Sequence, residues 1–243
     1  MTKNSIIAII LLIISAAFNT AEAKNFEFSA KAGINLGGTS PMGLPAEIRA
    51  INVFKPTFAF SIEGDVKRNF NEKWGLMAGI RFEVKGMSTD ATVKNYQILL
   101  QYEGAPIEGV FTGNVETKVK NSYITIPVAA VYDISKRWSL RFGGYMSFMV
   151  DGEFSGNAYN GYMHDGSPIG ERIDNVDAPY DFSEDMRKID AGVLVGADFV
   201  AYKHLLIYGD LAWGCVPLFD KNFTALSFNM YNVYLNLGFG YLF

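Results

Sequence analysis

The residues from Tyr231 to the C-terminus alternate between large apolar side chains and mostly polar or small ones. No other feature of the chain limits its fold as strongly. The first set is wholly apolar or aromatic: Tyr231, Val233, Leu235, Leu237, Phe239, Tyr241 and Phe243. Successive residues of a β-strand point to opposite faces, so this set covers one face of a strand. An apolar strand face that ends on an aromatic residue is typical of the last strand of a transmembrane β-barrel.

The N-terminus predicts export. A basic residue precedes an apolar stretch from Ile6 to Phe18, and small residues follow it as far as Ala23. This pattern is that of a secretory signal peptide cleaved between Ala23 and Lys24. A membrane anchor is the alternative, but the stretch is too short to cross a bilayer as a helix. We therefore expect residues 1–23 to be removed and residues 24–243 to form one domain.

Composition excludes several classes of site. The formal net charge is −4 and no basic stripe is present, which argues against a nucleic-acid partner. Cys215 is the only cysteine, so an intramolecular disulfide and a multi-cysteine metal site are both excluded. Residues 151–187 are strongly acidic, but their spacing matches no calcium-binding motif. We predict neither a metal nor a cofactor.

Period-two alternation recurs along the mature chain. Eight segments show it: residues 26–36, 57–67, 74–85, 123–132, 139–148, 188–199, 205–214 and 231–243. Each segment is about long enough to cross the hydrocarbon core of a bilayer as a tilted strand. The pattern predicts an all-β protein, an eight-stranded antiparallel up-and-down transmembrane β-barrel.

The connections between these segments alternate in length. Short connections lie at residues 69–73, 133–137 and 200–203, and long ones at residues 37–55, 87–121, 151–187 and 215–227. Outer-membrane barrels have short periplasmic turns and long extracellular loops, and eight strands that start and end in the periplasm give this order. Aromatic residues near both ends of the segments predict two girdles: Phe26, Phe28, Trp74, Trp138, Tyr241 and Phe243 at the periplasmic ends, and Phe58, Phe148 and Trp213 at the others.

A secreted lipocalin-like barrel is the main alternative fold. Such a barrel carries its apolar face inside and its polar face outside. Here the apolar rows would overfill the interior of an eight-stranded barrel, which side chains alone fill. We therefore expect the apolar rows to contact outer-membrane lipid and the charged rows to face inward, in a monomer.

Three segments carry a family resemblance. They are Lys31-Ala-Gly-Ile-Asn-Leu36, Tyr123-Ile-Thr-Ile-Pro127 and Phe239-Gly-Tyr-Leu-Phe243. With them the chain resembles the small outer-membrane β-barrel proteins of Bacteroidetes, a porin-family group similar in build to OmpA- and OmpX-like barrels. The resemblance implies a location in the outer membrane of a Gram-negative bacterium. It also implies that the barrel-assembly machinery reads Phe239, Tyr241 and Phe243 as an insertion signal.

Some members of that family assist protein secretion and carry an Arg-Tyr…Gly-Leu signature late in the chain. The matching region here reads Ile207-Tyr-Gly-Asp-Leu211 and lacks the arginine. The resemblance therefore indicates the class of barrel and leaves its activity open.

The inward-facing rows contain many charged residues of both signs. The predicted lumen network consists of Lys31, Glu63, Asp65, Arg81, Glu83, Lys85, Arg141, Lys188, Asp190, Asp198 and Asp210. Buried charges persist only when they are paired, and an eight-stranded barrel is narrow. We therefore expect ion pairs to plug the lumen, with a narrow ion or proton path as the alternative.

The loops offer one weak enzymatic pattern and two interaction surfaces. His164, Asp165 and Ser167 contain the residue types of an acyl-transfer triad, but neighbours in a Gly-rich loop rarely hold triad geometry. Residues 88–121 read as a hairpin that either offers an edge to a partner strand or caps the barrel mouth. The acidic residues 151–187 are a second surface for an extracellular protein or surface partner.

We thus expect a non-enzymatic protein with a structural or surface-interaction role. A narrow channel or an accessory of protein secretion is the alternative, followed by a lipid-modifying or proteolytic enzyme.

Overall fold

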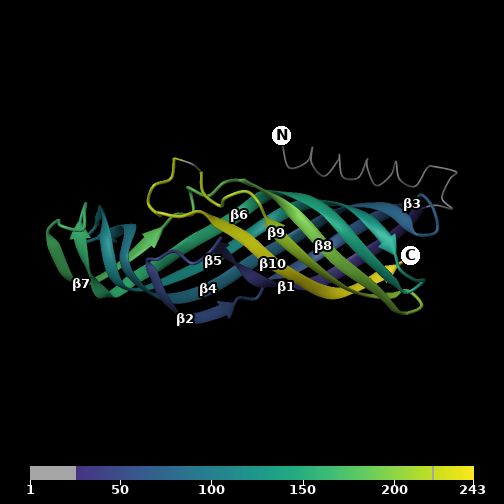
Figure 1. Ribbon diagram of the computed structural model, residues 1–243, viewed down its shortest axis with the longest axis horizontal. Helices are drawn as coiled ribbons and strands as arrows, with labels where there is room; N and C mark the ends of the chain where they lie inside the picture. The colour runs from purple at the N-terminus through teal and green to yellow at the C-terminus, as the bar shows by residue number, and fades with distance from the viewer. Residues whose placement is uncertain (1–25, 221) are drawn as a thin grey trace.

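The computed structural model describes residues 26–220 and 222–243. The predicted signal peptide and its cleavage site at Ala23 and Lys24 lie outside these residues. The strands, shown in Figure 1, are β1 (Phe26–Pro41), β2 (Ile48–Pro56), β3 (Phe60–Asn69), β4 (Trp74–Tyr102), β5 (Ala105–Asp133), β6 (Trp138–Asp165), β7 (Arg172–Asp181), β8 (Ile189–Tyr202), β9 (Leu205–Gly214) and β10 (Met230–Leu242). None of the described residues belongs to a helix long and apolar enough to span a membrane.

The sheet closes on itself within the described part of the chain. Around the ring the order is β1, β3, β4, β5, β6, β8, β9 and β10, and every neighbouring pair is antiparallel. The first and last strands of the ring pair from Ser29 and Leu242 to Pro41 and Met230. The predicted eight-stranded barrel is therefore confirmed.

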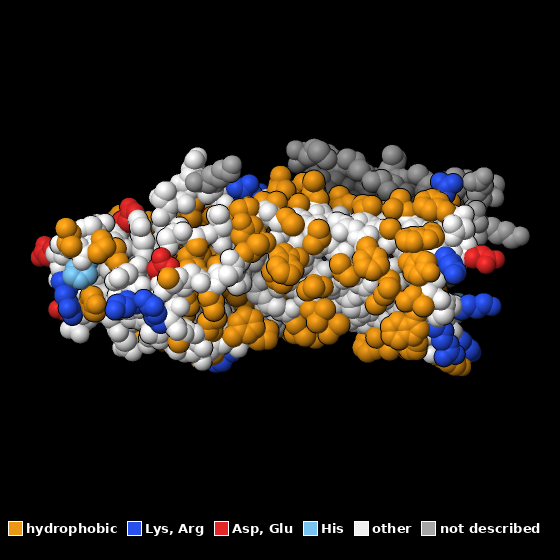
Figure 2. All heavy atoms as spheres, in the orientation of Figure 1, with side chains coloured by type: hydrophobic (Ala, Val, Ile, Leu, Met, Phe, Trp, Pro, Cys, Tyr) orange, Lys and Arg blue, Asp and Glu red, His pale blue; other side chains and the backbone are white. Residues whose placement is uncertain are grey.

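The two faces of the barrel wall differ as the period-two pattern predicted. Large apolar side chains project from the outer face of the ring, and Figure 2 shows them spread across the middle of the visible face, with charged side chains mainly near the two ends. We call this surface the lipid-facing belt; it includes Leu76, Phe82, Val128, Phe142, Met146, Val193, Val195, Ile207, Leu211, Leu235, Leu237 and Phe239. Trp74 with Tyr132 and Trp138 with Phe199 form aromatic pairs at its short-turn end. Lipid can solvate such a face because the strands satisfy one another's backbone hydrogen bonds.

Three strands continue far beyond the ring. β4 and β5 form one long hairpin, whose tip residues Glu103 and Gly104 both have positive φ angles of 49° and 83°. A two-residue turn of this kind matches the twist of a hairpin and favours glycine at its second position. β6 pairs with β5 along this extension, β2 pairs with β4 and β7 pairs with β6. Figure 1 shows the extension running on along the long axis of the barrel.

This extension, which we call the head, corrects two predictions. Residues 88–121 do form a hairpin, but it prolongs the wall instead of folding over the mouth as a cap (Figure 1). β6 flanks β5 along most of the hairpin, but β2 flanks β4 only as far as Val93, so the edge of β4 from Lys94 to Tyr102 has no described strand beside it. Residues 151–187, predicted to be a long connection between strands, supply the outer half of β6 and all of β7.

The inner face of the wall changes character where the ring gives way to the head. Inside the ring it is mostly polar, apart from a small apolar cluster that includes Met77 and Leu194, whereas in the head it is apolar. The apolar core of the head contains Met87, Val93, Ile98, Leu100, Phe111, Val115, Val119, Phe154, Met163, Val176, Tyr180, Phe182, Leu218, Phe219 and Leu226. The reversal follows from the surroundings, because lipid surrounds the ring whereas water surrounds the head. Burial of each large apolar side chain stabilises the head by ~1.5–3 kcal/mol.

Candidate functional site

Two arginines hold the centre of the barrel lumen. Arg81 on β4 bonds to Glu63 on β3, and its Nη2 lies 2.6 Å from Asp210 Oδ2 on β9. Arg141 on β6 reaches Asp210 and Asp198 at 2.7 and 2.8 Å. Both arginine side chains are only 1% exposed. A guanidinium can serve two carboxylates at once, so the two arginines and their partners link five strands across the lumen.

Lysines extend this network toward the short-turn end. Lys31 Nζ lies 2.8 Å from Asp65 and within 4 Å of Glu63 and Asp198. Near the turns Lys67 binds Asp133 at 2.8 Å, and Glu27 lies 3.5 Å away. Ion pairs therefore follow one another along the lumen axis from the turns to its centre.

Lys85 closes the network at the head end. Its ammonium lies 5.1 Å from the ring centroids of Tyr123 and Tyr145 and 5.8 Å from that of Tyr234. Glu83 and Asp190 lie 3.3 and 3.7 Å from the same ammonium. Cation–π attraction is strongest where water is excluded, and this side chain is 1% exposed. We call Lys85 and the three tyrosines the lysine cage.

The structure brings together every predicted lumen residue except Lys188. Lys188 precedes β8, its side chain is exposed, and its carbonyl accepts a hydrogen bond from the amide of Met149. The alternation predicts that its side chain faces the lumen. The strand begins only at Ile189, however, so Lys188 lies outside the strand and outside the barrel wall. The remaining residues form the lumen network: Lys31, Glu63, Asp65, Arg81, Glu83, Lys85, Arg141, Asp190, Asp198 and Asp210. Six carboxylates thus meet four basic side chains, and any leak through the lumen would favour cations.

A polar layer separates the lysine cage from the core of the head. Asn232 Nδ2 donates to Asp190 at 3.0 Å, and the Thr39 hydroxyl donates to Asn232 Oδ1 at 2.7 Å. Beyond this layer Tyr180 donates to the carbonyl of Glu116 and accepts from the Thr117 hydroxyl. Burial raises the pKa of the Tyr180 phenol, so it stays protonated at physiological pH. Sequence reasoning missed these residues because a lone Asn or Thr on a strand carries no motif.

The acyl-transfer residues do not assemble into a triad. His164 Nδ1 donates to the carbonyl of Gly170 at 3.0 Å, and its ring packs edge-on against Tyr162. The amide of Ser167 donates to the carbonyl of Asp165, as in a tight turn. The acidic residues of this region also form no cluster suited to a metal ion within the described ranges.

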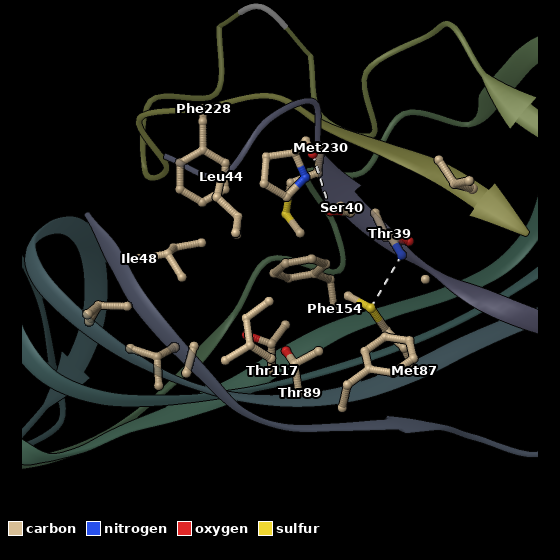
Figure 3. A pocket seen from close by; sticks show the side chains of 18 of the residues that line it. Thr39, Ser40, Leu44, Ile48, Met87, Thr89, Thr117, Phe154, Phe228 and Met230 are labelled. Atoms are coloured by element: carbon tan, nitrogen blue, oxygen red, sulfur yellow. Dashed lines mark hydrogen bonds between the residues drawn. The ribbon is translucent and has the colours of Figure 1, made fainter. Parts of the chain in front are cut away.

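An apolar cavity of about 280 Å³ lies where the ring meets the head. Figure 3 shows side chains converging on it from several elements, among them Leu44, Ile48, Met87, Phe154 and Met230. We call it the seam pocket, because it lies behind a gap in the wall between β1 and β2. The sequence did carry a signal for its outer wall, because the apolar residues Leu44, Ile48, Ile51 and Phe54 occur within a segment that is predicted to be a loop.

Comparison with known proteins agrees with this geometry. A family model described as "Outer membrane protein beta-barrel domain" matches residues 16–220. No curated protein matches the chain.

Among solved structures, the chain is similar to Ail, the attachment invasion locus protein of Yersinia pestis, at 13% identity and a TM-score of 0.40, with 90% of this chain and 98% of that chain covered. Neisserial surface protein A follows at 12% identity and a TM-score of 0.31, with 89% and 96% covered. OprG from Pseudomonas aeruginosa matches at 10% identity and a TM-score of 0.32, with 90% and 96% covered.

Proposed function

Because this chain belongs to the outer membrane protein β-barrel domain family and resides in the outer membrane of a Gram-negative bacterium, we propose that it is a closed barrel. This barrel displays a folded head at the cell surface. Its role is structural or surface-interacting, and it is not an enzyme. The single observation that carries this proposal is the reversal of the inner face from a paired polar lumen to a continuous apolar core.

The lumen network supports the closed state. An open aqueous pore needs a continuous column of water, whereas here Arg81 pairs with Asp210 from the opposite strand across the centre of the lumen, and Arg141 binds the same carboxylate. Above them the lysine cage and then the apolar core of the head occupy the axis. Side chains alone can fill an eight-stranded barrel. The alternative is a narrow cation path, which the excess of carboxylates in the lumen would favour.

The head supports the interaction role. Strands that served only to anchor a barrel could end at the membrane surface, yet β4 and β5 are each 29 residues long. Their apolar core fixes the shape of the head, so its outer face is a preformed surface. This face carries exposed charged residues from both predicted surfaces, including Glu108, Lys118, Asp174 and Asp177.

The edges of β2 and β7 argue against partner binding by strand addition at these two strands. β2 contains two register shifts and ends at Pro56, and β7 carries Asp177, Pro179 and Asp181. Bulges, prolines and charges are common protections of edge strands. We therefore assign partner binding to the outer face of residues 88–121 and 151–187, with an extracellular protein or surface as the partner.

The finer placement of the protein is part of the proposal. We propose that it is a monomeric member of the Bacteroidetes group of small barrels and that the barrel-assembly machinery inserts it. The alternation that ends at Phe243 supports this assignment. The absence of an enzymatic role is supported by His164, whose Nδ1 proton is engaged by the carbonyl of Gly170.

Two measurements test the proposal. In planar bilayers the purified protein should give no resolvable conductance steps. Stable cation-selective steps would show instead that the barrel is a channel and would contradict the closed state. In intact cells a photo-crosslinking residue at Lys118 should yield a discrete adduct, whereas the same residue at Lys136 in a short turn should not yield that adduct. If neither Lys118 nor a second head position, Asp177, gave an adduct, the interaction role would be lost.

A further inference from the structure

The barrel wall is interrupted between β1 and β2. β1 pairs with β3 only as far as Ile34 and Phe60, but it pairs with β10 on its other side as far as Pro41. In the head the place of β3 beside β4 is taken by β2, which pairs only with β4. Residues 36–41 of β1 therefore face β2, but the two strands do not pair. We call this gap the seam.

The seam pocket lies directly behind this gap. One side is lined by β1 from Gly37 to Pro41, and the other by Ile48, Ile51 and Phe54 of β2. Its floor is formed by Met87 and Phe154, which belong to the core of the head and are 3% and 2% exposed. Figure 3 shows Phe154 and Met87 pointing into the space below Leu44 and Met230.

The chemistry of the lining selects an uncharged apolar occupant. None of the described residues that line the pocket is charged, and its hydroxyls come from a few Ser, Thr and Tyr side chains. A cavity of about 150 Å³ lined by Leu, Ile and Phe takes up benzene, so 280 Å³ accommodates on the order of ten carbon atoms. An empty space of this kind forfeits dispersion contacts along its walls, so an apolar occupant is favoured.

The place of the opening identifies the source of that occupant. The seam begins where the lipid-facing belt ends, because Phe58, just before β3, and Ile62, near the start of β3, are 83% and 59% exposed below it. The outer rim continues this apolar surface with Leu44, Ile51 and Phe54, all at least half exposed. Lipid is therefore the apolar material in contact with the rim.

We propose that the seam pocket binds one acyl chain of a lipid in the outer leaflet, which enters sideways between β1 and β2. Gly38 keeps the passage narrow but open, since a Cβ at this position would lie 2.8 Å from Met87 Sδ and 3.2 Å from the Phe54 ring. The inference goes beyond the proposed function and does not depend on whether the barrel conducts or binds a partner.

Photolabelling of the mature protein in lipid nanodiscs tests the proposal. One arm contains a phospholipid with a diazirine in its acyl chain, and the other contains diazirine-bearing decane as a freely diffusing hydrocarbon. Adducts are then mapped by mass spectrometry. The informative sites are Met87 and Phe154, which lipid outside the barrel cannot touch, whereas Phe142 in the belt reports ordinary lipid contact.

The proposal expects lipid adducts on Met87 and Phe154 as well as on Phe142. It is overturned if lipid adducts stay confined to the belt, and equally if only the decane probe reaches Met87 and Phe154. The mapping uses the unmodified protein, so it remains decisive even if a variant fails to fold.

Two matched variants locate the binding. Ala91→Phe fills the pocket from β4, and Ala50→Phe makes the same change on β2 at a position that does not line it. Ala91→Phe should abolish the adducts on Met87 and Phe154 and retain those on Phe142, whereas Ala50→Phe should retain both. Heat-modifiable migration in gels verifies that each variant is folded. Undiminished labelling of Met87 in folded Ala91→Phe would contradict the proposal.

Discussion

Arg81 and Asp210 are 129 positions apart in the chain, yet their side chains meet at 2.6 Å in the middle of the lumen. Neither is on a strand next to the other's, since β4 and β9 are separated by β3, β1 and β10 on one side of the ring. The contact therefore spans the barrel. The two charges can pair in this way only when the ring of strands is closed.

Removal of Arg81 should destabilise the barrel strongly. Arg81→Met leaves Glu63 and Asp210 short of a partner in a site where each carboxylate is 0% exposed. Breaking a buried ion pair in this way typically costs ~3–5 kcal/mol. The free energy of unfolding in urea, measured in detergent or lipid vesicles, should fall by an amount of this order.

The matched control for Arg81→Met is Arg172→Met. Arg172 also pairs with a carboxylate at 2.7 Å, but it and Asp174 are more than half exposed on β7. Exposed pairs contribute roughly 0–1 kcal/mol, so this variant should unfold almost as the parent does. Adding Asp210→Asn to Arg81→Met should recover part of the lost stability. Equal losses in both single variants would mean that the lumen charges are not paired as described.

Lys85→Ser should make the barrel leak cations. The change empties the lysine cage and leaves six carboxylates facing three basic side chains in the lumen. We expect small cation-selective steps in planar bilayers that the unmodified protein lacks. Lys188→Ser, at the exposed position before β8, serves as control and should stay closed. If Lys85→Ser gave no more conductance than the unmodified protein, the core of the head alone would block ion flow and the lysine cage would not contribute.

Phe154→Ala should loosen the head and spare the barrel. The Phe154 ring packs against Phe219 and Phe182 with centroids 5.0 and 6.2 Å away. Removing a buried phenylalanine typically costs ~3–5 kcal/mol. Protease added to intact cells should then cut within residues 88–121 or 151–187, whereas the barrel should still migrate as a folded species. Ile169→Ala, at a side chain 96% exposed, should change neither readout.

Phe243→Ala should lower the yield of inserted protein. The Phe243 ring is 72% exposed and packs against Tyr241, so its loss takes little from the folded barrel. We expect the effect to lie in recognition by the assembly machinery. The readout is the amount of heat-modifiable barrel in outer-membrane fractions, with Phe70→Ala in a short turn as control. Equal yields from the two variants would disprove an assembly role for Phe243.

The ring was predictable because each of its strands has one face toward lipid and one toward a polar interior. The alternation of Leu235, Leu237 and Phe239 with Asn232, Asn236 and Gly238 in β10 shows that contrast directly. The same alternation identified the charged residues that face the lumen. It failed for Lys188 because alternation alone does not tell at which residue a strand begins.

The head was harder to predict because its interior reverses the rule. Val176, Ala178 and Tyr180 alternate with Asp177 and Pro179, and this is a strand pattern in its own right. The acidic residues dominate the composition of this region and hide that pattern, so the sequence predicts a long connection there. The seam pocket needed the structure, since its walls come from segments that no local pattern brings together.

The most direct test of the central claim measures whether lipid or water contacts the outer wall of the barrel. Single nitroxide labels would replace Phe142 and Val195 in the belt and Lys118 and Asp177 on the head, in a Cys215→Ser background reconstituted in lipid. If the apolar rows face lipid, collisions with oxygen should exceed those with a water-soluble nickel chelate at Phe142 and Val195, and the order should reverse at Lys118 and Asp177. Stronger collisions with the nickel chelate at both belt positions would contradict a membrane-embedded barrel.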